Sequence, residues 1–116
     1  MTLLEELQEN GADITDGLCR MMNNSELYER LLKKLPSSIS QQDVIPYLES
    51  GDIETATRNA HTIKGVTGNL SITPLYKAYT EIVNLLRAGK VDEAKTLYTD
   101  TIPVQEHFLQ IIKKYC

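Results

Sequence analysis

Signals that begin and end α-helices recur along the whole chain, and they limit its possible folds more than any other feature. Short polar side chains that suit a helix N-cap, such as Asp13 and Asp52, precede apolar residues at helical spacing. Glycine or proline follows several of these segments and ends them. No segment alternates apolar and polar residues as a strand would, and no hairpin dipeptide joins apolar runs. The sequence therefore predicts an all-α fold.

The caps and the apolar spacing also predict where each helix lies. The predicted helices cover residues 3–8, 14–22, 26–35, 41–49, 53–70, 74–88 and 91–115. Ser40-Gln41-Gln42-Asp43 resembles a capping box for the helix 41–49, which bends or begins at Pro46. Pro36 is expected to stop the preceding helix, and Pro103 to kink or split the last one. Thr73 is expected to cap the helix 74–88, with Pro74 in its first position.

These helices are sufficient for an antiparallel four-helix bundle with short additional N-terminal helices. Its main helices would be residues 26–35 extended by 41–49, then 53–70, 74–88 and 91–115. At 116 residues the chain is expected to form one domain, residues 1–116.

Charge and hydropathy narrow the class of protein. A formal net charge of −4 and a sequence pI of 5.1 argue against a nucleic-acid-binding protein. No apolar run approaches the roughly 20 residues of a transmembrane helix, and the N-terminus lacks a signal-peptide pattern. We therefore expect a monomer in the cytoplasm that binds neither nucleic acid nor membrane. In that compartment the cysteines, Cys19 and Cys116, are expected to be reduced thiols without a metal-ligand spacing.

The helix predicted at residues 53–70 has two distinct faces. On a helical wheel one sector is apolar and would face the core; it holds Ala56, Ala60, Ile63, Thr67 and Leu70.

A neighbouring sector of the same helix holds an unusual set of residues: His61, Lys64, Gly65 and Gly68. Each glycine inside a helix costs roughly 0.5–1 kcal/mol relative to alanine. Both glycines lie outside the apolar sector, so core packing does not account for them. The pattern predicts an imidazole on the flank of the bundle, beside a lysine and a surface stripped of side chains, where another protein could approach closely.

The chemistry of this surface follows from its residue types. Histidine titrates near neutrality and can accept a phosphoryl group as a phosphoramidate. Phosphoryl transfer depends mostly on positioning and on cations near the equatorial oxygens, which the ammonium of Lys64 could supply. The chain has no Gly-rich nucleotide-binding loop and no acidic pair for Mg²⁺. We therefore expect a phosphotransfer intermediate and not an enzyme with its own kinase machinery.

The segment Ala60-His61-Thr62-Ile63-Lys64-Gly65-Val66-Thr67-Gly68-Asn69-Leu70 resembles the signature of histidine-containing phosphotransfer (Hpt) domains. The upstream stretches 11–20, 26–32 and 48–52 also follow the opening pattern of this family. The resemblance extends from about Gly11 to the last helix. It implies a four-helix bundle that relays phosphate between receiver domains, or from a sensor or hybrid histidine kinase to a receiver.

The resemblance also implies a role for individual residues. His61 would be the phospho-acceptor, Lys64 would stabilise the phosphate, and Gly65, Gly68 and Asn69 would meet the receiver. Arg87 aligns with a basic position near the phosphorylated ring in some members, although a solvated surface arginine is an equal interpretation. No cofactor would be bound by this chain, and Mg²⁺ would be held by the receiver together with its aspartate.

One position departs from the family pattern. Many members carry Gln or Glu on the following helix to bond the second ring nitrogen, where this chain has Val83. Tyr79, Asn84 or a water molecule could replace that contact. The second histidine, His107, has no accompanying lysine or glycine pattern and is interpreted as structural.

The sequence is also compatible with two other functions. The first is a non-catalytic helical adaptor that docks receiver domains without carrying phosphate, to which Val83 lends some support. The second is a small helical enzyme or metal protein, which the 46-residue separation of the only two histidines disfavours.

Overall fold

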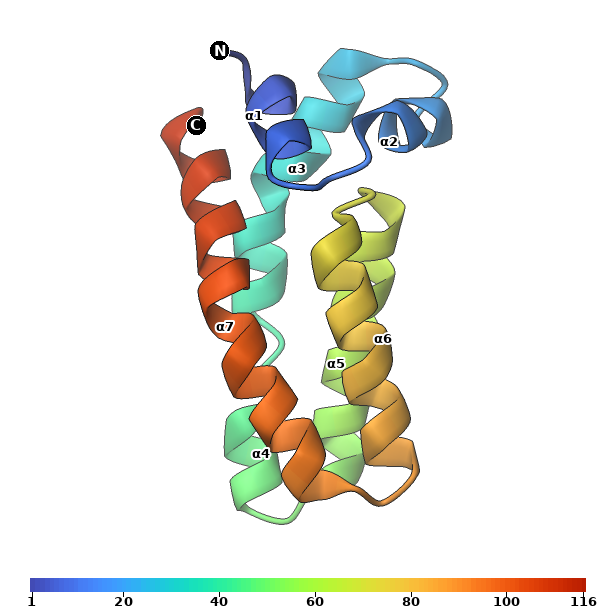
Figure 1. The fold of residues 1–116 in the computed structure, drawn as a ribbon, viewed down its shortest axis with the longest axis vertical. Coiled ribbons are helices and arrows are strands. Elements are labelled where there is room, and N and C mark those ends of the chain that lie inside the picture. The colour runs from blue at the N-terminus through green and yellow to red at the C-terminus, as the bar shows by residue number, and fades with distance from the viewer.

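The computed structural model describes residues 1–116 as α-helices joined by short turns, without a strand. The helices are α1 (Leu3–Glu9), α2 (Ile14–Arg20), α3 (Ser25–Ser40), α4 (Ile45–Glu49), α5 (Ile53–Asn69), α6 (Thr73–Arg87) and α7 (Val91–Lys114). Helices α5, α6 and α7 run antiparallel along the 42 Å axis, with α3 beside α7 (Figure 1). Short helices α1 and α2 lie at one end and α4 at the other, so the predicted all-α bundle is confirmed.

Polar caps begin several of these helices as the sequence predicted. Each of Asp13, Asn24 and Asp52 accepts a hydrogen bond, 3.1 Å long, from the backbone N–H three residues further along. These bonds satisfy donors that the first turn of a helix leaves without partners. Thr2 and Glu5 form a capping box at α1 that the sequence analysis did not anticipate.

The prediction that Pro36 ends the third helix was wrong, because α3 continues through it to Ser40. Proline inside a helix costs about 3 kcal/mol. The buried side chains of α3 keep one helical stripe on both sides of the proline: Tyr28, Leu32, Leu35 and Ile39. Burial of Leu35 and Ile39 in the core offsets the cost of the missing hydrogen bond.

The predicted capping box at residues 40–43 was also wrong. Ser40 is the last residue of α3, and α4 begins only at Ile45, after a cap at Val44 that uses no side chain. Val44 and Leu48 are buried, so the core determines where this short helix lies. Pro46 stands in its first turn, where a missing N–H is tolerated, so the helix begins one residue before the proline and agrees with the expected start there to within one residue.

Two expectations concern the later helices. Of the two outcomes expected at Pro103, the split does not occur, because α7 runs without interruption from Val91 to Lys114. Thr101 and Gln105, on either side of the proline, are both buried, so packing holds α7 continuous. Thr73 is the first residue of α6 and not its cap, while Pro74 falls in the first turn as expected.

Tyr28 joins the N-terminal helices to the end of α5. Its hydroxyl is buried and donates a 2.5 Å hydrogen bond to the carbonyl oxygen of Leu70. A Cβ on Gly17 would lie 2.2 Å from the same hydroxyl oxygen, so only glycine lets α2 approach this closely. This contact places α2 beside the C-terminal end of α5. None of the helices combines the length and the apolarity that a transmembrane span requires.

Candidate functional site

Helix α5 separates a buried face from an open one. The predicted core residues are all buried: Ala56, Ala60, Ile63, Thr67 and Leu70. His61 is exposed, as its position on the helical wheel predicted. The imidazole therefore stands on the flank of the bundle, where solvent and other proteins can reach it.

His61 lines a shallow hollow between α5 and the C-terminal end of α6. The other residues that line this hollow are Ile53, Glu54, Thr57, Arg58, Thr62 and Arg87. Arg87 thus shares a cavity with His61, although the two residues are far apart in sequence. Arg58 was not among the predicted site residues. Its position three residues before His61, on the same side of the helix, is the signal that could have found it.

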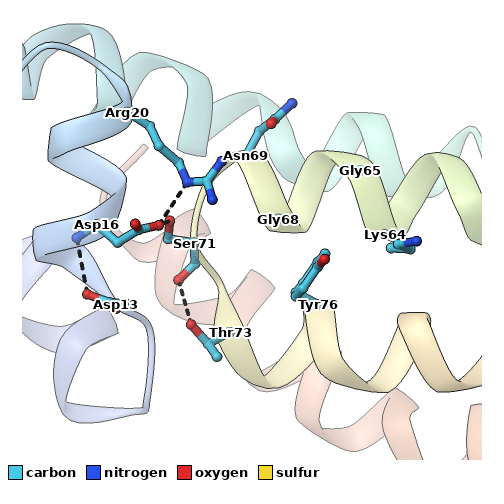
Figure 2. A pocket seen from close by; sticks show the side chains of 10 residues that line it. All are labelled: Asp13, Asp16, Arg20, Lys64, Gly65, Gly68, Asn69, Ser71, Thr73 and Tyr76. Carbon is cyan, nitrogen blue, oxygen red and sulfur yellow. Dashed lines mark hydrogen bonds and ion pairs between the residues drawn. The ribbon is translucent and has the colours of Figure 1, made fainter.

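Lys64 lines a different cavity, a groove between α5, α6 and α2 with a volume of about 520 Å³ (Figure 2). Gly65, Gly68 and Asn69 line the same groove from α5. The opposite side comes from α2 and from the start of α6, through Asp13, Asp16, Arg20, Ser71, Thr73 and Tyr76. The structure therefore brings together the predicted docking residues and adds polar groups of α2 that the sequence did not place there.

The two glycines on this face differ in their surroundings. A Cβ on Gly65 would meet no atom within 4 Å, so its face is open. A Cβ on Gly68 would lie 2.8 Å from the ring of Tyr76 on α6, which Figure 2 shows across the groove from α5. The argument that core packing explains neither glycine holds for Gly65. Gly68 also lies outside the core, but its missing side chain makes room for the exposed ring of Tyr76 on α6, so its face is not open.

Asp16 fixes the wall that α2 contributes to the groove. Its carboxylate accepts hydrogen bonds from Ser71 Oγ at 2.6 Å and from Arg20 Nε at 2.8 Å (Figure 2). These two bonds, that of Ser71 foremost, hold the pKa of Asp16 below its ordinary value. Asp16 therefore stays ionised at neutral pH and ties α2 to the turn between α5 and α6, with Arg20 left exposed at the groove.

The family model of the Hpt domain matches residues 2–111 of the chain. The chain belongs to the Hpt domain family. This confirms the resemblance seen in the sequence, and membership implies histidine phosphotransfer in two-component signalling. No curated protein and no solved structure matches the chain.

Val83 is the position at which the sequence was expected to depart from the family pattern. Val83 is fully buried in the core of the bundle. Tyr79 is also buried, and its hydroxyl donates a hydrogen bond to Gln105 Oε1 on α7. Burial raises the pKa of Tyr79, so its hydroxyl keeps its proton and remains committed to Gln105. Two side chains could replace the expected contact to the ring nitrogen. Tyr79 is bonded to Gln105 instead, and Asn84 is exposed on α6.

The second histidine of the Hpt domain lies on a different surface. His107 Nε2 is 2.8 Å from Asn10 Oδ1, at the place where α7 meets the end of α1. No group of three or more His, Cys, Asp or Glu side chains is placed to hold a metal ion.

Proposed function

We propose that this Hpt domain carries a phosphoryl group on His61 between other proteins of a phosphorelay. It would take the group from a phospho-aspartyl receiver or a histidine kinase and pass it to the aspartate of a receiver. The observation that supports this most directly is the exposure of His61 on the flank of α5, one turn from the open face of Gly65.

The transfer is an in-line displacement at phosphorus. A ring nitrogen of His61 attacks the acyl phosphate of the receiver, a P–N bond forms, and the P–O bond to the aspartate breaks. Reversing the step delivers the group to the next receiver. The aspartate and a bound Mg²⁺ would come from that partner, while Lys64 and Arg87 would place positive charge near the equatorial oxygens.

The groove beside His61 suits the docking of a receiver. The open backbone at Gly65 lets a loop of the partner approach α5, and the exposed Asn69 offers a hydrogen-bonding group at the edge of the groove. Gly68 contributes by letting Tyr76 pack low against α5. A relay requires rapid exchange of partners, so we expect a small and transient interface with a monomeric Hpt domain.

The test is incubation with a phosphorylated receiver. The wild type should gain a phosphate that is labile in acid and stable in base, whereas His61→Gln should gain none. Equal labelling of the two proteins would remove His61 from the mechanism and end the proposal.

A non-catalytic adaptor is the second possibility, and the burial of Val83 is the observation that favours it, because this side chain offers no hydrogen bond to the ring. The same experiment separates the two. An adaptor would bind the receiver as measured by calorimetry and would remain unlabelled in the wild type.

A further inference from the structure

We propose that Arg58, together with Arg87, holds the phosphoryl group on His61 in the hollow on the N-terminal side of the imidazole. This inference rests on the proposed function and adds to it the residue that stabilises the phosphorylated resting state. It assigns a different task to Lys64, which would act during transfer to the receiver.

The first support is the division of the α5 surface into two cavities. His61 lines the hollow with Arg58 and Arg87 and does not line the groove that holds Lys64. Side chains on an α-helix lean toward the helix N-terminus, so each covers the turn before its own Cα. His61, Arg58 and Lys64 all lean the same way, so the lean does not separate the two cations, whereas the hollow that His61 shares with Arg58 and Arg87 does.

The geometry of α5 places two cations on opposite flanks of the ring. Arg58 is three residues before His61 and Lys64 is three residues after it. At 100° and 1.5 Å per residue, each lies about 60° around the axis from His61, in opposite senses, and about 4.5 Å along it. A long side chain can reach the ring from either position. The hollow that His61 shares with Arg58, and not with Lys64, favours Arg58 as the cation nearer to the phosphoryl group.

The charges of the hollow favour an anion. Arg58 and Arg87 are exposed, and the ion pairs of the structure, Arg20–Asp16 and Lys114–Glu6, involve neither of them. Glu54 is the acidic residue that lines the hollow, and it lies about 10 Å along the helix axis from His61. Glu54 lies four residues before Arg58 on the same helix, and the pKa of Asp52 is lowered by hydrogen bonds with Thr55 and also by the charge of Arg58, but neither carboxylate forms an ion pair with Arg58. Both guanidinium groups can therefore bind phosphate oxygens through paired N–H donors.

The experiment uses phosphoramidate, a small phosphate donor that needs no protein partner. The phosphoryl group moves from the nitrogen of phosphoramidate to a ring nitrogen of His61; ammonia leaves and takes up the proton that the ring loses. Titration of the phosphorylated protein by ³¹P NMR then gives the pKa of the phosphoryl group. A nearby cation favours the dianion and lowers this pKa.

Removing Arg58 should therefore raise the midpoint of the titration. For Arg58→Ala we expect a rise of about 0.3–0.7 pH units, as for a solvent-screened charge pair, and a smaller rise for Arg58→Lys. Arg87→Ala should act in the same direction. Arg30→Ala is the matched control, because Arg30 is an exposed arginine on α3 that does not line the hollow.

The outcomes separate this inference from the proposed function. If the Arg58→Ala midpoint equals that of the wild type, or if Lys64→Ala raises the midpoint more than Arg58→Ala does, the inference is overturned while His61 remains the acceptor. If neither phosphoramidate nor a phosphorylated receiver labels the wild type at His61, the proposed function fails, and this inference fails with it. Circular dichroism of each variant confirms that the bundle remains folded.

Discussion

The two histidines of this Hpt domain lie on surfaces of opposite character. His61 projects from α5 beside open backbone and lines a hollow with arginines that have no ion-pair partners. His107 belongs to a region that we call the terminal clasp, where the two ends of the chain meet (Figure 1). The clasp consists of Glu6 and Asn10 from α1 and its end, and of His107, Lys114 and Tyr115 from α7 and its end.

Every side chain of the clasp has a partner. Asn10 bonds His107 at 2.8 Å, and Glu6 accepts from Lys114 Nζ at 2.7 Å and from Tyr115 Oη at 2.8 Å. Beneath the clasp Leu3 and Leu7 are buried in the core. The difference teaches that exposure alone does not identify a functional histidine. The groups around His107 are paired with one another, whereas the arginines that share the hollow with His61 form no ion pair and are free to meet an anion.

Exchanging each histidine gives the sharpest test of this comparison. His61→Gln should abolish labelling by a phosphorylated receiver, while His107→Gln should label at the wild-type rate, because Gln still bonds Asn10. Loss of labelling in His107→Gln with the bundle intact would show that the clasp participates in the relay and would break the comparison.

Removing the side chain of Lys64 should reduce phosphoryl transfer less than replacing His61 does. We expect Lys64→Ala to slow transfer to a receiver by about tenfold, the cost of one charge-assisted contact in the transition state, without unfolding the bundle. Rapid-quench kinetics with a phosphorylated receiver measures the rate. The control is Lys113→Ala, an exposed lysine of α7 on the clasp side. A wild-type rate in Lys64→Ala would exclude Lys64 from the mechanism.

The same Gly→Ala change should have opposite effects on stability at the two surfaces. Gly65 faces open space in a helix, so Gly65→Ala should raise the free energy of unfolding by up to about 1 kcal/mol and slow docking of a receiver. Gly11, next to the clasp, has a φ of +106°, and a Cβ there would lie 3.1 Å from Pro74. Gly11→Ala should therefore lower stability by about 1–2 kcal/mol. Urea denaturation measures both changes, and a destabilised Gly65→Ala would contradict the open face.

The sequence predicted the parts of this molecule that depend on local rules. Asp13 and Asp52 cap their helices because capping involves only the first turn. The two faces of α5 follow from the helical period, and so does the exposure of His61.

The parts that the sequence did not predict depend on contacts between distant residues. Pro36 was expected to end a helix, yet burial of Ile39 carries α3 beyond it. Gly68 was assigned to an open face because a single helix cannot reveal Tyr76 on the next one. The spacing of Arg58 from His61 was visible in the sequence, but the position of Arg87 of α6 in the same hollow was not. Each of these contacts depends on the relative position of two helices, which no local pattern contains.

The smallest expected effect concerns the clasp and pH. Hydrogen bonds from Lys114 and then Tyr115 hold the pKa of Glu6 below its ordinary value of 4.5. The lowered pKa means that ionised Glu6 stabilises the folded state above pH 4.5, and that this contribution disappears as the pH falls through the folded pKa. Glu6→Gln should therefore lower the melting temperature slightly at pH 7 and by less at pH 3. Glu81→Gln, a change at an exposed glutamate of α6 without an ion-pair partner, is the control. Because the clasp is separate from the His61 surface, Glu6→Gln should leave labelling by a receiver unchanged. A melting-temperature difference of the same size at both pH values would mean that Glu6 acts through packing and not through its charge.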